Sequence, residues 1–526
     1  MANRLDYTYR RLVNALGPGR VARGAFETFV YGHDFAAIPK AAEFQFKVAP
    51  DFVVLPRTTE EVVRLVGMQA ENLLPLVPRG GGTGLYGGSV PNRGGVLVDF
   101  RKMNRVLKVD AATRTMVVEA GCTWQDAYDR ALAAGLFLPV YPQFALGSTI
   151  GGWINSGGVG FGANKYGTAR DLLLNLEVVL ADGRTVLTGA DRVDLGTSHL
   201  NLGPLVWGSE GTLGLVTKAT LRLYPKPEEI RPLAYAFPSL DDAVPALRAL
   251  AALPVAPYHV MLIDASHLQF LKAVRYEAPE PTAMLLVVFE GPKDEVGEGE
   301  KLADAAMKAN GGGKVAAETA KRLWENRLYQ YPTRRIANGL VICEGVVPLG
   351  KLKDALAKTR SLQRAMKMEV ALTGQLVDAN TVALYPYFLD DETSPLPPMR
   401  LGFVIKWREL LMDQGSPIGE MLGRSEVERP LQGHPMGVGL FLAFNVPAMH
   451  GNAHRFFPAI KDAFDPNGRI NFGKMHQIRT RFGFPGLRRI PLMIAALPFK
   501  VLGAVKAIIP KQDRFVRKYT GEGRAR

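Results

Sequence analysis

The stretch PRGGGTGLYGG, residues 78–88, limits the fold of this chain more than any other feature. Within it, residues 82–87 spell G-x-G-x-x-G, the fingerprint of Rossmann folds, which requires a strand before the turn and a helix after it. Residues 73–78 can form the strand. Residues 88–95 contain a proline and three glycines, so no helix fits before the next predicted strand at 96–100. The sequence therefore argues against a Rossmann unit.

The same loop can bind an anion in another way. Four of the six residues 79–84 are glycine, and successive glycines can direct several backbone N–H groups at one anion beside the cation Arg79. Two further glycine-rich segments follow at 142–167 and 207–214. Such density suits backbone packed against a flat ring or a phosphate chain. Strands are predicted around these segments at 106–109, 115–118, 174–180 and 216–224. A hairpin turn is predicted at 182–183.

Composition narrows the class of protein. At 526 residues the chain is long enough for two or three domains, and its two cysteines exclude a disulfide scaffold and suit a reducing compartment. The net charge of +14 is concentrated at one end, because residues 479–526 hold 12 Lys or Arg against two acidic residues. We therefore expect no nucleic-acid partner. Without a secretory signal or a long apolar run, we expect a cytoplasmic protein.

The three glycine-rich segments, in this order and spacing, resemble the FAD-binding domain of the vanillyl-alcohol oxidase and p-cresol methylhydroxylase (PCMH) superfamily. The match covers about residues 50–227, within a predicted domain 1–227. It implies that the first loop holds the FAD pyrophosphate, the second lies along the ribityl chain and ring, and the third closes over the adenine side. The implied FAD contacts are Arg79, Gly80, Gly81, Gly82, Thr83, Gly84, Pro142, Gly147, Ser148, Thr149, Gly151, Gly152, Asn155, Gly158, Glu210, Gly214 and Val216.

The resemblance also bears on how flavin is attached. Relatives with covalent flavin often have a histidine at the position of Thr83, and some have a cysteine near Ala145. Neither nucleophile is present here, so we expect non-covalent FAD.

The second half resembles the D-lactate dehydrogenase and glycolate oxidase flavoprotein group, through AFDPNGRINFGK at 463–474, WENR at 324–327 and VPLGKL at 347–352. The resemblance implies an α+β protein. Its cap domain, 228–475, contains an antiparallel sheet and returns at its C-terminal end to the FAD domain, where Asn471 is a further FAD contact. The flavin ring is expected at the junction of the two domains.

The chain departs from that group at its metal ligands. Members that oxidise α-hydroxy acids carry G-H-x-G-D-G-N-x-H and a later E-H-G, whereas this chain has Gln375 and Val382 at the two histidine positions and His434 without a neighbouring glutamate. One imidazole is not a metal site. We predict no divalent metal.

Three residues are candidates for catalysis. His434 can accept a hydroxyl proton as a general base, although a loop hydrogen bond is an equal alternative. Arg327 can pair with a substrate carboxylate or form a surface salt bridge. Tyr385 can contact substrate or pack in the core.

These features predict a dehydrogenase that takes a hydride from an alcohol or hydroxy-acid-like C–H group and passes electrons to quinone or an electron-transfer protein. One alternative is an oxidase that uses O2, because Gly158 would leave an oxygen path open. Another is a flavin electron-transfer subunit without its own substrate.

Residues 476–526 form a separate basic, apolar tail. Its uninterrupted apolar run, 490–499, is too short to span a bilayer, and prolines divide the segment. Short apolar pieces bounded by cations suit an anionic membrane interface, which would make the protein peripheral on the cytoplasmic face. Packing on the protein itself or on a partner subunit is the alternative.

Overall fold

The computed structural model describes residues 2–36, 46–72, 74–189, 200–275, 279–280, 282–329, 331–335, 337, 339–390, 397–412, 431–436 and 446–475. These residues form two compact units. Unit 1 contains the described residues of 2–160, 168–226 and 446–475, and unit 2 contains those of 161–167 and 227–436. The predicted tail, 476–526, lies outside the described residues. No helix in the described ranges is long and apolar enough to cross a bilayer.

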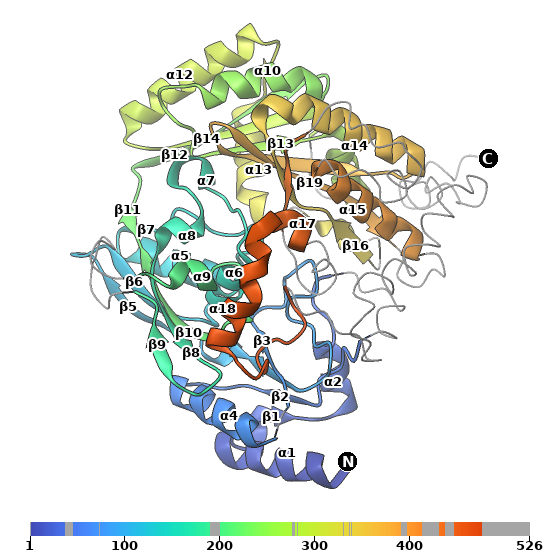
Figure 1. Ribbon diagram of the computed structural model, residues 1–526. Helices are drawn as coiled ribbons and strands as arrows, with labels where there is room; N and C mark the ends of the chain where they lie inside the picture. Colours follow the sequence, from blue (N-terminus) through green and yellow to red (C-terminus); the bar gives the residue numbers. More distant parts are fainter. Residues whose placement is uncertain are drawn as a thin grey trace. The chain divides into compact units, whose positions relative to one another are not determined.

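Unit 1 begins with a small sheet of strand order β1-β2-β4-β3, of which Figure 1 labels β1, β2 and β3. Strands β2, β4 and β3 are parallel, and β1 joins β2 antiparallel. Helix α4 connects β2 to β3; it starts with two acidic residues in its first turn, which suits a helix N-terminus. The elements are α1 (Ala2–Leu16), β1 (Val21–Ala22), α2 (Ala25–Tyr31), β2 (Phe52–Val54), α4 (Thr59–Asn72), β3 (Leu76–Arg79) and β4 (Val96–Asp99).

The core of this layer is formed by apolar residues of α1, α4 and the parallel strands, together with Ile470 from the far end of the chain. Leu76 donates its backbone N–H to the carbonyl of Arg469, and Asn471 donates to the carbonyl of Leu76. The segment around Ile470 therefore pairs with β3 through one short parallel bridge.

A second sheet in unit 1 has the order β5-β6-β10-β8-β9 and is antiparallel throughout. The predicted strands 106–109, 115–118, 174–180 and 216–224 are confirmed within one or two residues, and a turn follows at 182–183. The elements of this part are β5 (Val106–Asp110), β6 (Thr115–Glu119), α5 (Trp124–Ala133), β7 (Leu136–Phe137), α6 (Ile150–Ser156), α8 (Ala169–Leu172), β8 (Leu173–Val179), β9 (Thr185–Leu187), α9 (Gly203–Val206), β10 (Leu215–Arg222), β11 (Tyr224–Pro225), α17 (Val446–His450) and α18 (Phe457–Phe464).

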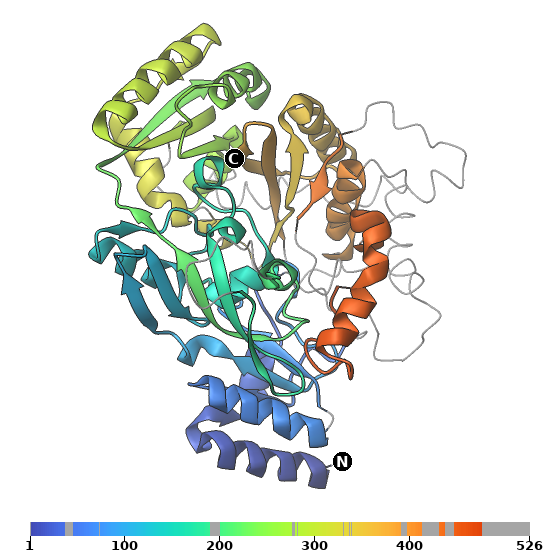
Figure 2. The same cartoon turned by 60° about the vertical axis from the view of Figure 1, so that its left-hand side comes forward.

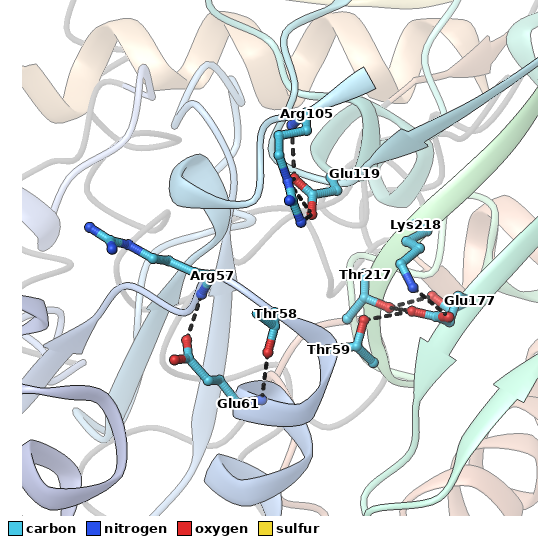
Figure 3. Close-up of polar contacts among 9 residues, drawn as sticks. All are labelled: Arg57, Thr58, Thr59, Glu61, Arg105, Glu119, Glu177, Thr217 and Lys218. Carbon is cyan, nitrogen blue, oxygen red and sulfur yellow. Dashed lines mark hydrogen bonds and ion pairs between the residues drawn. The ribbon is translucent and has the colours of Figure 1, made fainter. Parts of the chain in front are cut away.

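Glu177 of β8 joins the two layers of unit 1 (Figure 3). Its carboxylate accepts hydrogen bonds from Thr59 of α4 (2.6 Å) and Thr217 of β10 (2.7 Å), and Lys218 donates to its second oxygen (3.0 Å). Burial alone would raise the pKa of Glu177, but these donors outweigh it and lower the pKa. A charged group therefore fixes α4 against the antiparallel sheet.

Unit 2 is built on one antiparallel sheet of order β15-β12-β14-β13-β18-β19-β17-β20, with β16 also paired to β19. Its central strand β14 is buried along its whole length, which explains the unbroken apolar run AMLLVVF. The strands are β12 (Glu229–Phe237), β13 (His259–Ile263), β14 (Ala283–Gly291), β15 (Gly313–Lys314), β16 (Gly339–Ile342), β17 (Gly345–Pro348), β18 (Ala371–Asp378), β19 (Thr381–Asp390) and β20 (His434–Pro435).

Long helices and short helices of unit 2 pack on different faces of this sheet. Phe289 of β14 lies against Gly299 of α12, and the rings of Phe388 of β19 and Phe403 of α15 meet edge to face, so long helices cover this face of the sheet (Figures 1 and 2). The long helices are α10 (Leu240–Ala251), α12 (Lys293–Ala309), α14 (Leu352–Met366) and α15 (Pro397–Leu411). The opposite face meets short elements: α7 (Ala163–Tyr166), α11 (Ala265–Ala273), α13 (Ala317–Glu325) and the 3-10 turns Asn326–Tyr329 and Pro332–Arg335.

Candidate functional site

The first glycine loop leaves β3 at Arg79 and reaches the parallel strand β4 without an intervening helix. This confirms that the fingerprint does not open a Rossmann unit. Gly82 has a φ of 67°, a left-handed conformation that favours glycine. Arg79 donates to the carbonyl of His33 (2.6 Å) and lies over the ring of Tyr31, and burial lowers its pKa.

The first and second glycine loops pack directly on each other. A Cβ at Gly80 would collide with the side chain of Thr149, and one at Gly81 with the carbonyl of Gly147. The hydroxyls of Thr83 and Ser148 share a hydrogen bond of 2.8 Å. Several glycines expected to make room for a cofactor thus have a second role, because they allow close contact between loops.

The third loop is attached to the second through Asn155, at the end of α6. The Asn155 backbone carbonyl accepts from the N–H of Glu210 (2.8 Å), and its side-chain oxygen accepts from Ser209 (3.2 Å). Gly157 and Gly208 approach so closely that a Cβ on Gly157 would lie 2.9 Å from the Gly208 Cα. The three segments predicted from the sequence to share one ligand therefore converge in unit 1.

Asn471 ties the C-terminal segment to two of these loops. Its side-chain amide donates to the carbonyls of Glu210 (2.5 Å) and Gly88 (3.1 Å). Both Asn471 and Glu210 have left-handed backbones, with φ of 43° and 53°. This φ is uncommon for residues other than glycine and is a local strain that contacts on both sides hold in place.

The remaining predicted FAD contacts lie on the same loops or directly behind them. Pro142 accepts a backbone hydrogen bond from Ala145 as the second loop begins. Thr149 caps α6 by accepting from the N–H of Gly152 (3.2 Å). Three further positions have no room for a Cβ: Gly151 meets Ala120, Gly158 meets Trp153 and Gly214 meets Val178. Val216 is buried in β10.

The converging loops fit a dinucleotide cofactor such as FAD. The side-chain oxygen of Asn471 is buried and has no hydrogen-bond partner among the described residues, so it is an acceptor that a bound ligand can use. FAD would be held by the Gly80–Gly84 loop, by Ser148 and by Asn471.

Unit 2 brings the candidate catalytic residues to one face of its sheet. Thr373 lies opposite Tyr385, Ala383 lies opposite Val346, and Val346 lies opposite His434. Directly opposed residues share a face, and so do residues two apart in a strand. Tyr385 and His434 are therefore on the face that the short elements meet, with Gln375 and His259 on the same side.

Arg327 is placed against this face by aromatic rings. Its guanidinium lies 4.2 Å from the Trp324 ring and 6.0 Å from the Phe161 ring, and it donates to the carbonyl of Trp324 (2.9 Å). His259 contacts both rings. A guanidinium stacked in this way is held in one plane, which suits a flat carboxylate partner.

The three candidates differ in accessibility. His434 is exposed on the edge strand β20, whereas Tyr385 is 3% exposed and its hydroxyl has no hydrogen-bond partner in the described part of the chain. Burial raises the pKa of Tyr385 well above its ordinary value, so it is a neutral donor. Arg327 is half-buried.

Gln375 and Val382, which stand at the two expected histidine positions, lie on opposite faces of the sheet. Gln375 pairs with Ala383, and Val382 pairs with Leu376. Gln375 and Leu376 are consecutive in β18, so their side chains, and those of their partners, point to opposite faces. No cluster of three or more His, Cys, Asp or Glu suited to a metal occurs within the described residues.

Sequence reasoning missed three polar residues: the buried His259 and Lys474, and the partly buried Asp34. Lys474 ends the motif at 463–474, but nothing in the sequence predicts its contacts with Gly87 and Val90. His259 could not be found from the sequence either, because it begins an apolar strand, β13, that is typical of a buried sheet.

Two family models match consecutive stretches of the chain. A model of an FAD binding domain matches residues 50–189, and one of the C-terminal domain of FAD linked oxidases matches residues 226–397. D-lactate dehydrogenase from Archaeoglobus fulgidus is 34% identical over 438 residues, covering 82% of this chain and 92% of that protein. Glycolate oxidase subunit GlcD of Bacillus subtilis is 28% identical over 476 residues, covering 88% and 96%.

Solved structures confirm the expected fold. p-Cresol methylhydroxylase with substrate bound has a TM-score of 0.77 at 19% identity, covering 91% of this chain and 98% of that one. 4-Ethylphenol oxidase from Gulosibacter chungangensis has a TM-score of 0.73 at 20% identity, covering 92% and 99%. The expected cofactor, FAD, and the expected enzyme class, an FAD-linked oxidoreductase acting on CH–OH donors, are confirmed. The chain belongs to the family of FAD-linked oxidoreductases that includes D-lactate dehydrogenase and the glycolate oxidase subunit.

Proposed function

We propose that this enzyme is a dehydrogenase that oxidises a hydroxy acid to the corresponding oxo acid without a divalent metal. The observation that carries the proposal is the shared face of the cap sheet, where a stacked guanidinium, a neutral phenol and an exposed imidazole lie on one side. The names of the relatives D-lactate dehydrogenase and glycolate oxidase support a hydroxy acid as substrate.

Each residue has one role in this proposal. Arg327 binds the substrate carboxylate, and Tyr385 donates a hydrogen bond to the hydroxyl oxygen. His434, on β20 and therefore four strands along the sheet from β13, is the candidate base that accepts the hydroxyl proton while the adjacent C–H bond breaks and the C=O bond forms. Bound FAD supplies the acceptor for the hydride. Fixing the carboxylate and the hydroxyl by protein side chains removes the need for a metal that chelates both.

The central test is anaerobic bleaching of the flavin with a panel of 2-hydroxy acids and with alcohols that lack the carboxylate. Arg327→Lys keeps the charge but loses the planar fork, so we expect the KM for hydroxy acids to rise about 10-fold or more, with a smaller change in kcat. Arg322→Lys, an exposed position on α13, is the matched control. Bleaching by alcohols alone, unaffected by Arg327→Lys, would refute the substrate assignment.

Metal independence has a separate test. Dialysis of the holoenzyme against EDTA should leave the rate of flavin bleaching unchanged, because Gln375 and Val382 replace two imidazole ligands. Loss of bleaching that returns with Zn²⁺ or Mn²⁺ would contradict this part of the proposal.

We favour quinone or an electron-transfer protein over O2 as the acceptor. Gly158 was the basis of the oxidase alternative, but the space beside it is taken by the indole of Trp153, which a Cβ there would meet at 2.6 Å. Rapid dye reduction with little hydrogen peroxide supports a dehydrogenase, whereas stoichiometric peroxide favours the oxidase. If His434→Ala leaves substrate-dependent flavin reduction unchanged, the assigned base is wrong.

Membrane quinone is a natural acceptor if the basic tail binds anionic lipid. Each cation near such a surface contributes about 1 kcal/mol, so the +10 carried by residues 479–526 is enough for peripheral binding. Deleting residues 481–526 should leave FAD bound and abolish cosedimentation with anionic liposomes. A truncated protein that still pellets with them, or a full-length protein that never does, contradicts the assignment.

A further inference from the structure

Lys474 is a buried cation whose hydrogen bonds go to Gly87, near the end of the glycine-rich stretch 78–88, and to Val90 just after it. The residue is 2% exposed, and its ammonium donates to the carbonyls of Gly87 (2.5 Å) and Val90 (2.6 Å). Burying an ammonium is costly unless donors are satisfied and an opposite charge is near. A buried lysine that uses its donors on one turn therefore holds that turn strongly.

Asp34 approaches the same turn from the N-terminal part of unit 1. Its carboxylate accepts from the N–H of Ala36 (2.9 Å), and its other oxygen lies 3.5 Å from the hydroxyl of Ser89. A Cβ on Gly84, the last glycine of the pyrophosphate loop, would lie 3.6 Å from that oxygen. Burial raises the pKa of Asp34, and the charges of Lys474 and Arg79 oppose the rise.

Residues 84–90 are thus held by side chains from both ends of the sequence. Asn471 adds a hydrogen bond to the carbonyl of Gly88, three residues before Lys474 in the chain. Consecutive carbonyls of Gly87 and Gly88 point toward these side chains. In a trans peptide the next N–H points the opposite way, so the contacts also fix the direction of the N–H groups of Gly88 and Ser89.

We propose that Lys474 is a positioning residue for FAD: its contacts with Gly87 and Val90, next to Asp34, set the shape of the loop that receives the pyrophosphate. The role is separate from that of the predicted FAD contact Asn471, and it does not depend on the substrate proposed above. Lys474 and Arg79 also place two cations behind a loop that binds an anion, which favours the charged phosphate.

The direct test is FAD affinity. Lys474→Met keeps a long apolar stem but removes the donors, and we expect the Kd of the apoprotein for FAD to rise at least about 10-fold, which corresponds to one or two lost hydrogen bonds. Lys47→Met is the matched control, because Lys47 is a half-exposed lysine of unit 1 whose ammonium bonds to Asp51 rather than to the loop. It should leave the Kd unchanged.

A stability measurement separates positioning from a purely structural role. Unfolding midpoints of the apo and FAD-bound forms are compared for wild type and Lys474→Met. Positioning predicts that the stabilisation gained on adding FAD shrinks in the variant. A fall of both midpoints by the same amount, with the Kd unchanged, would overturn the proposal.

The pH dependence of FAD binding gives a second readout. Burial lowers the pKa of Lys474 to about 7, while the charges of Asp34 and Glu210 facing it oppose the shift. The ammonium therefore loses its proton as pH rises above neutrality, and the wild-type Kd should increase from pH 6.5 to pH 9. Lys474→Met should be flat over that range; a variant that follows the wild-type curve would count against Lys474.

Discussion

His259 shows how one buried side chain can oppose folding. Both of its ring nitrogens are buried without a hydrogen-bond partner among the described residues, between the rings of Phe161 and Trp324. An unsatisfied buried polar atom costs about 1–3 kcal/mol. Burial, aided by the charge of Arg327, lowers the pKa of His259 to about 3.

Replacing His259 by phenylalanine should therefore stabilise the protein. The reason is that the substitution keeps an aromatic ring and removes two unsatisfied atoms, and we expect the midpoint of thermal unfolding to rise. His267 is the matched contrast, because its Nδ1 shares a hydrogen bond with the Tyr387 hydroxyl (2.7 Å). His267→Phe should lower the midpoint. Destabilisation by both substitutions would argue that His259 has a partner in solution.

The same residue predicts a pH dependence of stability. Between pH 6.5 and about 3 the unfolded chain binds a proton at His259 that the folded chain does not, so stability falls as pH falls through this window. The loss from this residue is about 1.4 kcal/mol per pH unit in the middle of that window. Urea unfolding at pH 7, 6 and 5 should show a shallower decline for His259→Phe than for wild type; parallel curves would exclude the effect.

At the scale of elements, the packing of α4 depends on a polar contact rather than on apolar contacts alone. Glu177 is where a helix of the parallel layer meets two strands of the antiparallel layer (Figure 3). Thr59 and Thr217 share one carboxylate oxygen, and Lys218 takes the other. The Thr217 hydroxyl also lies 3.3 Å from the backbone carbonyl of Glu177, but that contact is longer than the one to the carboxylate.

Glu177→Gln should lower the free energy of unfolding by about 1–3 kcal/mol, because an amide replaces a charged acceptor and presents N–H donors to hydroxyls and an ammonium. Asp182→Asn, in the exposed hairpin turn, is the control and should change stability little. The measurement is chemical denaturation at pH 7. If Glu177→Gln changes the free energy of unfolding no more than the control does, α4 is held by its apolar face alone.

At the scale of the whole molecule, unit 2 is not one continuous piece of chain. Residues 161–167 belong to it, although the residues on either side belong to unit 1. Lys165 and Tyr166 both contact the buried carboxylate of Glu290 (2.8 and 2.7 Å), and Asn164 donates to the carbonyl of Pro257 (2.7 Å). The second glycine loop therefore continues directly into residues 161–167, which pack on the sheet of unit 2.

A fragment of residues 227–436 should accordingly fold poorly, because Glu290 loses both of its partners and the sheet loses the residues that cover it there. The sharp test is a crossed comparison. Glu290→Gln should stabilise the fragment, where it removes an unpaired charge, and destabilise the full-length protein, where it breaks two contacts. Circular dichroism and thermal unfolding measure both; the same sign in both backgrounds would contradict the argument.

Local pattern was enough for much of this protein. The sequence predicted the glycine segments, the absence of a helix after residue 88 and the strands of the antiparallel layer. These features depend on the backbone conformations that each residue type allows, and such preferences act over a few neighbouring residues. Three-dimensional packing decided the rest. That Gly81 meets Gly147, that Lys474 holds Gly87, or that Gln375 and Val382 lie on opposite faces depends on contacts between distant segments. Such contacts arise only when the core and the strand register form together, and no single segment encodes them.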